Sequence, residues 1–454
     1  MRILRRAIII CIMNLLDKRK YLIWSGLACM LIPFFFACDD PNELGILVEG
    51  DEQGIRVRDT TFTLPISTIY IDSLRTDQFN STIVGRSLDS IFGELKAESY
   101  FHYGPLGGVG PGDTLEFSSS FIVLEAEDIS AKESLSNEHW DFHEALDTLY
   151  SQAIYLANKE TPYDPNPILQ YDFSFNPEDD SLISCPFDIV GQKLFDQLVK
   201  AEQDTVFRDS LVSGQLYYSP LVLVPGDQNE GLFTLELDSD TAGIYVEMRS
   251  PSTDSLYYYK FNLGRKGYYS RIVRDRSGST LQSLQNEYED EYVSDRAYGS
   301  MVHGVYLKVD LQPLQNFVDQ HNSLVVNDSR LTLNTVDYSS MDFISPYPNV
   351  QFLFIRGSKI NGPGTILSSE RFFNALLNEA SYRSSSGQQS LLTMSLQSDS
   401  TIYRGSTTLF TQLFADAQSN EDRDELVVIN PFVTSVKQTV FTDAQLDFYY
   451  TLLE

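Results

Sequence analysis

The stretch DAQLDFYYTLL, residues 443–453, decides the class of fold that the sequence predicts. Every second residue in it is apolar, and the residues between are mostly polar. The apolar positions are Ala444, Leu446, Phe448, Tyr450 and Leu452. Successive side chains of a β-strand point to opposite faces of a sheet, so this alternation predicts a strand with one buried and one solvated face.

The same alternation appears in GVYLKVDL (304–311) and GLFTLELD (231–238). Such segments, rich in Val, Tyr, Phe and Thr, are typical of antiparallel sheets. The sequence therefore predicts a mostly β protein with antiparallel, sandwich-like sheets. Apolar residues at helical spacing predict a few short helices, over 189–200, 369–380 and 408–415, which would lie over sheet edges or ends.

The length of the chain predicts more than one domain. Its 454 residues, 42% of them hydrophobic, are enough for two or three domains with real cores. The strongest acidic run, NEYEDEYVSDR (286–296), is a candidate boundary. We predict an N-terminal mostly β region over 59–285, an acidic linker over 286–300, and a C-terminal mostly β region with short helices over 301–454.

The first 37 residues have the pattern of an export signal. Basic residues come first, and the apolar run YLIWSGLACMLIPFFFA (21–37) follows them. The run is shorter than the roughly 20 apolar residues that span a membrane. Cys38 comes directly after it and resembles the lipidated cysteine of bacterial lipoproteins, although Phe35 and Phe36 depart from the usual Leu-Ser/Ala. We predict a signal peptide over 1–37 and a lipidated Cys38; cleavage of an ordinary secreted protein nearby is the alternative.

The residues that follow Cys38 predict where the protein faces. CDDPNELG begins an acidic tether over 38–58, and acids directly after the lipidated cysteine resemble the export signal of surface-exposed Bacteroidota lipoproteins. Loss of a leader with six basic residues and one acidic residue leaves a net charge of −35, against −30 for the whole chain. Such a charge excludes nucleic-acid partners. We expect an outer-membrane location that faces outward, with a periplasmic orientation as the alternative.

The cysteines exclude several kinds of chemistry. Cys11 and Cys29 lie in the leader, so the mature chain keeps only Cys38 and Cys185. If Cys38 carries lipid, no disulfide framework, zinc cluster or thiol redox pair can form. We expect Cys185 to be a small buried apolar residue.

Several longer segments resemble one family. They are the acids after Cys38 with ELG (43–45), SIFGELKAESYF (90–101), the predicted helix before SGQLYYSP (213–220), MVHGVYLKVDL (301–311) and the final QLDFYYTLL (445–453). Together they resemble the domain of unknown function 4270 family of Bacteroidota outer-membrane lipoproteins, over nearly the whole mature chain. The resemblance implies an anchored, mostly β ectodomain and assigns no activity and no functional residues.

Motifs for catalysis or for metal binding are weak. GPLGGVGPGD (104–113) lacks the phosphate-binding pattern, and we expect a plain loop. DSDTAG (238–243) has Ala242 and Arg249 where a calcium loop needs ligands, so we expect a hairpin turn. His139 and His143 would share a face of a helix but lack a third ligand, and a solvated helix or loop is favoured over a metal site.

We therefore predict no catalytic residue, no metal and no cofactor. The sequence has no G-x-S-x-G motif, which is the main serine-hydrolase signature. A pair of carboxylates could still serve a glycosidase, and sequence alone does not place such a pair.

One tripeptide, Asp followed by Ser or Thr and an aliphatic residue, is over-represented. It resembles the O-glycosylation acceptor of exported Bacteroidota proteins; the alternative is a structural role in turns that lead into strands. The candidate acceptors are Ser73, Ser90, Thr114, Thr148, Ser181, Thr205, Ser210, Thr241 and Ser255.

These features favour a non-enzymatic surface lipoprotein. It would be a binding or assembly subunit of an outer-membrane complex, for example accessory to a β-barrel protein-insertion or transport machine. The alternative is a carbohydrate-binding or glycan-processing lipoprotein, for which 28 Phe and 26 Tyr residues and many carboxylates give general support. A structural protein of the surface layer or of attachment machinery is the third reading.

Overall fold

The computed structural model describes residues 56–454 with gaps. The residues left out within this range are 73, 78–79, 106–114, 132–134, 213–217, 288, 292–294, 322, 338–350, 357–380, 384–388, 392, 398–400, 417–424, 430–435 and 454. The predicted leader, Cys38, most of the tether and the predicted helix over 369–380 therefore lie outside the described residues.

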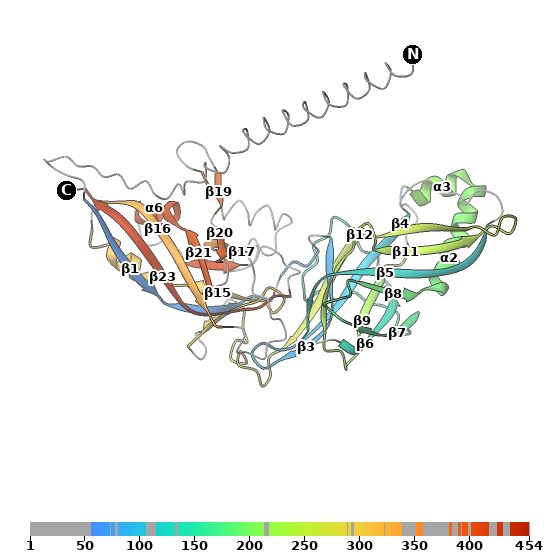
Figure 1. Cartoon of the computed structure of the whole chain (residues 1–454), viewed down its shortest axis with the longest axis horizontal. Helices are drawn as coiled ribbons and strands as arrows, with labels where there is room; N and C mark the ends of the chain where they lie inside the picture. Colours follow the sequence, from blue (N-terminus) through green and yellow to red (C-terminus); the bar gives the residue numbers. More distant parts are fainter. Residues whose placement is uncertain are drawn as a thin grey trace, which may run out of the picture. The chain divides into compact units, whose positions relative to one another are not determined.

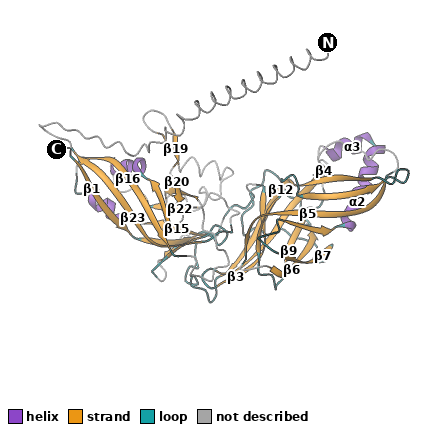
Figure 2. Cartoon of the chain, in the orientation of Figure 1, coloured by secondary structure: helices purple, strands orange, loops and turns teal. Residues whose placement is uncertain are grey.

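Strands dominate the described residues, as Figure 2 shows, and all their pairings are antiparallel. The mostly β class predicted from the sequence is confirmed. Among the residues that the structure describes, four short helices accompany the strands: α2 (Asp188–Gln203), α3 (Thr205–Val212), α4 (Gln312–Val318) and α6 (Thr408–Asp416). The predicted helices over 189–200 and 408–415 correspond to α2 and α6.

One sheet has ten strands, which come from residues 81–275. Its strands in spatial order are β12 (Leu256–Asp275), β11 (Gly243–Arg249), β5 (Glu116–Ser130), β10 (Leu232–Glu236), β3 (Ser81–Asp89), β4 (Gly93–Pro105), β9 (Leu221–Pro225), β6 (Leu135–Glu144) and β7 (Leu169–Phe175), with β8 (Leu182–Pro186) paired to β5. β12 also pairs with β4, so the path of strands closes on itself.

The second sheet has eleven strands. In spatial order they are β1 (Val57–Leu64), β23 (Thr439–Leu452), β16 (Leu324–Thr335), β21 (Ile402–Ser406), β20 (Thr393–Leu396), β17 (Gln351–Arg356), β22 (Leu426–Ile429), β15 (Val305–Val309), β2 (Ile66–Tyr70) and β13 (Asp290–Glu291), with β14 (Ala297–Gly299) paired to β23. A separate pair joins β18 (Ser381–Arg383) and β19 (Gln389–Leu391).

The strand pairing differs from the domain boundaries that the sequence suggested. β1 and β2 lie at the N-terminal end of the predicted 59–285 region, yet they pair with β23 and β15 of the second sheet. Figure 1 shows the blue β1 beside the red β23. The predicted acidic linker contributes β13 and β14 to the same sheet. Acidic composition is visible in the sequence, whereas pairing between distant segments is not.

The alternation of apolar residues is realised most clearly in β23. Ala444, Leu446 and Phe448 are buried in the core of the second sheet, and Tyr449, directly after Phe448, is 41% exposed. β10 and β15 instead bury both faces: Thr234 is buried between Phe233 and Leu235. The wet face predicted for these two strands is therefore wrong, because core residues pack against both of their faces.

The DSDTAG segment is not a hairpin turn. β10 pairs with residues 125–130 of β5, and β11 continues along the same side of β5 over residues 116–123. The segment is thus a short loop between two strands that pair with successive parts of β5. Turn residues mark where a strand is interrupted, but they do not say which strand the next segment pairs with.

Within the described residues, no helix is both long enough and apolar enough to cross a membrane.

Candidate functional site

The histidine pair lies on a strand rather than on the predicted helix or loop. β6 carries His139, Trp140 and His143, and Trp140 packs its ring 4.6 Å from that of Phe173. His139 contacts the carboxylates of Asp172 and Asp141, at 2.6 and 3.2 Å. His143 donates from Nδ1 to the carbonyl oxygen of Asp164. Among the described residues no group of three metal-ligating side chains comes together.

The candidate O-glycosylation residues occupy turns and element ends. Ser90, Ser181, Thr205, Thr241 and Ser255 are exposed, and Thr148 and Ser210 are half-buried. Ser73 and Thr114 lie outside the described residues. An acceptor hydroxyl must reach an enzyme, so the exposed residues satisfy the first requirement for modification.

The aspartates of this tripeptide also have structural roles. Asp89 Oδ1 accepts hydrogen bonds from the backbone N–H groups of Ile91 and Phe92. Asp204 Oδ1 does the same for Val206 and Phe207 at the start of α3, as an N-cap does. The two readings of the tripeptide are therefore compatible.

Cys185 lies in β8 and is fully buried. Burial raises the pKa of its thiol. A thiol in an apolar core is inert as a nucleophile.

A pocket of about 430 Å³ opens beside β4 and β12. It is lined by Tyr100, Glu160, Thr161, Pro162, Tyr163 and Arg271. Arg271 donates from Nη2 to Glu160 at 2.5 Å and from Nη1 to both carboxylate oxygens of Glu98 at 3.2 and 3.3 Å. Burial opposes the charge of Arg271, but the two carboxylates outweigh it and raise the pKa of the guanidinium.

A stack of three tyrosines supports this pocket. Tyr269 lies between Tyr100, at 4.5 Å, and Tyr155, at 4.7 Å, with the rings nearly parallel. The Tyr269 hydroxyl donates to Thr161 Oγ1 at 2.7 Å, and the Tyr100 hydroxyl donates to Glu98 at 3.0 Å. Burial raises the pKa of Tyr100 and of Tyr269, so both hydroxyls stay protonated as donors.

A second candidate surface is the outward side of β5, β11 and β12, which we call the outer aromatic face. It comprises Phe121, Tyr245, Leu256 and Tyr258. The Phe121 and Tyr245 rings stack at 5.2 Å, and Tyr258 lies 6.4 Å from Phe121. Tyr258 is 56% exposed and Leu256 is 50% exposed. The opposite side of β5 and β11 is covered by α2, which buries Leu194 and Leu198 against it.

Acidic side chains border the outer aromatic face. Glu125 follows on β5 and Glu236 lies on β10, paired with it. Burial, followed by repulsion from Glu125 and Asp238, raises the pKa of Glu236. Lys260, which lies opposite Tyr245, brings its Nζ to 5.8 Å from the centre of the Tyr245 ring, so charges of both signs border the face.

Compared with known proteins, the chain matches no family model and no curated protein. Sequence reasoning missed both the pocket and the outer aromatic face. The pocket joins residues from 98–100, 160–163 and 271, and no spacing in the sequence links them. The run LYYYK (256–260) was the visible signal for the outer face, since three successive tyrosines in a strand place an aromatic ring on each face of the sheet.

Proposed function

We propose that this protein is a lipid-anchored lipoprotein of the outer membrane, facing outward, that acts as a non-enzymatic binding subunit of an outer-membrane complex. The observation that carries the anchor is Cys38, placed directly after the apolar run and before two acids. One acyl chain binds membranes only marginally, and a multiply acylated cysteine would hold the protein stably. The resemblance to the domain of unknown function 4270 family supports the same reading.

The outer aromatic face is the proposed docking surface. Exposed tyrosines at the centre of a patch are the residues that most often carry binding energy between proteins. The net charge of −35 for the mature chain favours a partner with a basic rim around an apolar centre. We therefore propose a protein partner in the outer membrane whose contact surface carries lysine or arginine.

Purification of the native protein from detergent-solubilised outer membrane tests this proposal. We expect co-purification of a membrane protein in fixed ratio. Replacement Tyr258→Ala should weaken the complex about tenfold or more, since a central aromatic anchor contributes about 1.4 kcal/mol or more. Tyr449→Ala, which removes an exposed tyrosine from the other sheet, is the matched control. Recovery of the protein as a lone monomer would contradict the proposal.

We further propose that some of the exposed Asp-Ser/Thr sites carry O-linked glycans. Ser181, Ser255 and Thr205 are the best candidates, because each is exposed and begins or precedes a strand or helix. The intact mass of the mature protein should exceed that of the acylated polypeptide by whole glycan units. An intact mass that equals the acylated polypeptide would exclude this modification.

A further inference from the structure

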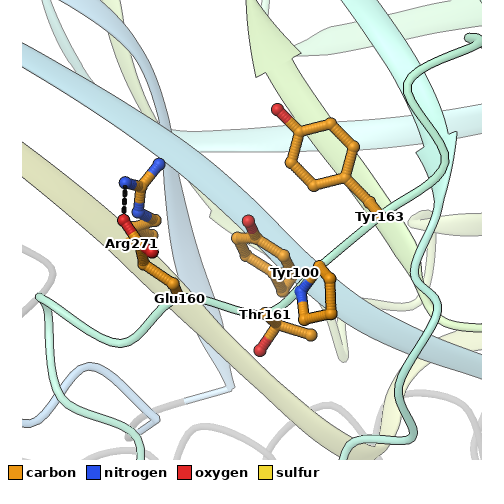
Figure 3. Close-up of a pocket in the computed structure, with 6 residues that line it drawn as sticks. Tyr100, Glu160, Thr161, Tyr163 and Arg271 are labelled. Atoms are coloured by element: carbon orange, nitrogen blue, oxygen red, sulfur yellow. Dashed lines mark hydrogen bonds and ion pairs between the residues drawn. The ribbon is translucent and has the colours of Figure 1, made fainter.

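We propose that the pocket beside β4 and β12 binds a neutral sugar ring. This proposal is independent of the docking surface above, because the pocket shares no residue with the outer aromatic face. Its volume of about 430 Å³ lies within the range of small-molecule sites. In Figure 3 the Arg271–Glu160 pair and the Tyr163 ring lie on opposite sides of Tyr100.

One side of the pocket offers both donors and acceptors. Arg271 is a donor only, whereas Glu160 accepts from Arg271 at 2.5 Å and keeps further lone pairs free. The Glu160 side chain is 77% exposed, so it is open to a ligand. A hydroxyl group can donate to a carboxylate and accept from a guanidinium at once, which matches adjacent hydroxyls of a sugar.

The other side of the pocket is apolar. Tyr163 is half-buried and Pro162 is exposed. The face of an aromatic ring carries negative partial charge, and the C–H groups on the flat side of a sugar ring carry positive partial charge, so the two attract. A ring seated on Tyr163 would therefore present its hydroxyl edge to the Arg271–Glu160 pair.

The charges of the pocket argue against anionic ligands. Arg271 is already shared by Glu98 and Glu160, so an anion would have to displace a carboxylate and would be repelled by the other. A neutral polyhydroxyl ligand meets no such repulsion, and this selects sugars over phosphates and carboxylates.

The walls of the pocket are held in place before a ligand arrives. Tyr163 bridges to Ala145 of the neighbouring chain segment, and Leu146 N–H donates to the Pro162 carbonyl at 2.8 Å. The His143 ring lies 4.8 Å from the Tyr163 ring. Because these side chains are already ordered, less of the binding free energy is spent on fixing them when a ligand binds.

A glycan array probed with the full mature chain in detergent tests the proposal, followed by titration with the free neutral sugar that terminates the bound glycans. We expect binding of neutral glycans. Glu160→Gln should weaken it about tenfold or more, since a hydrogen bond to a charged group contributes about 1.5 kcal/mol or more. Tyr163→Ala should weaken it by a similar factor, and Tyr163→Phe, which keeps the ring, should stay within about threefold of the native protein.

Glu178→Gln is the matched control, because Glu178 is an exposed carboxylate outside the pocket. Glu160→Gln removes an exposed charge and keeps the test valid if Tyr163→Ala fails to fold. Absence of any bound glycan, binding restricted to acidic glycans, or equal binding by the native protein and Glu160→Gln would each overturn the proposal. Tyr258→Ala should leave sugar binding unchanged, which separates this result from the docking result.

Discussion

At the scale of single residues, buried ionisable groups give the sharpest expectations. Glu138 lies in β6, with its side chain buried and Oε1 accepting from the backbone N–H of Glu230 at 3.0 Å. Burial raises the pKa of this carboxyl to about 7, although backbone hydrogen bonds favour the charged form. The folded protein therefore holds a proton on Glu138 at pH values where the unfolded chain has released it.

The pH dependence of stability tests the state of Glu138. A raised carboxyl pKa contributes stability that is fully present below the unfolded pKa of about 4.5 and is lost as the pH rises through about 7. The contribution amounts to about 3 kcal/mol at most. We expect urea unfolding to show a smaller fall in stability between pH 5 and pH 8 in Glu138→Gln than in the native protein. Equal falls in both would contradict this, and Glu178→Gln serves as the exposed control.

Cys185 gives a second expectation at this scale. Because the thiol is buried and its pKa is raised, a thiol-alkylating reagent should not modify it in the folded protein at pH 8. The same reagent should modify it fully in denaturant, as measured by mass spectrometry. Rapid modification without denaturant would show that β8 opens or is misplaced.

At the scale of elements, the turn that leads into β15 is closely constrained. Gly304 has φ = +66°, and a Cβ there would lie 2.5 Å from the carbonyl oxygen of Ile71. Arg274 and Arg276, near the end of β12, donate to the carbonyl oxygens of Val302 and His303 in the same turn, each at 2.8 Å. The turn therefore connects the end of one sheet with the beginning of a strand of the other.

Gly304→Ala should destabilise the protein more than Gly278→Ala does. Both glycines have positive φ, +66° and +75°, but nothing lies within 4 Å of a Cβ at Gly278. The difference between the two variants therefore isolates the clash with Ile71, which we expect to cost more than about 1 kcal/mol. Equal unfolding midpoints for the two variants would contradict the described turn.

The strands and two helices could be predicted because their signals are local. Alternation in β23 and helical spacing in α2 and α6 follow directly from which faces are buried. Two features could not be predicted, because they depend on neighbours far away in the sequence. They are the pairing of β10 and β11 with successive parts of β5, and the burial of both faces of β15. The pocket was missed for the same reason, since Glu98, Glu160 and Arg271 come from three separate segments.

At the scale of the whole molecule, the two ends of the described chain belong to one sheet. β1 pairs with β23 over eight residues, from Val57 opposite Thr451 to Leu64 opposite Ala444. The segment that follows the predicted tether is therefore structural, and the tether must end before residue 57. The first strand after a lipid anchor at Cys38 would therefore be β1, an edge strand of the second sheet.

Deletion of residues 56–64 should weaken the second sheet selectively. Without β1, residues 444–451 of strand β23 become an unpaired edge, and Phe448 loses its contact with Phe62, whose ring centroid lies 5.9 Å away. We expect faster amide hydrogen exchange across 444–451 and unchanged exchange across 94–105 in the first sheet. Unchanged protection of 444–451 would contradict the pairing of the two ends.

The measurement that tests the central claim most directly is metabolic labelling with palmitate in the native host. We predict that label enters the native protein, that the label maps to Cys38 as the first residue, and that Cys38→Ser abolishes both labelling and membrane association. A native protein that carries no label, or a processed Cys38→Ser variant that still fractionates with the outer membrane, would contradict the claim that this β-rich protein is held at the membrane by lipid.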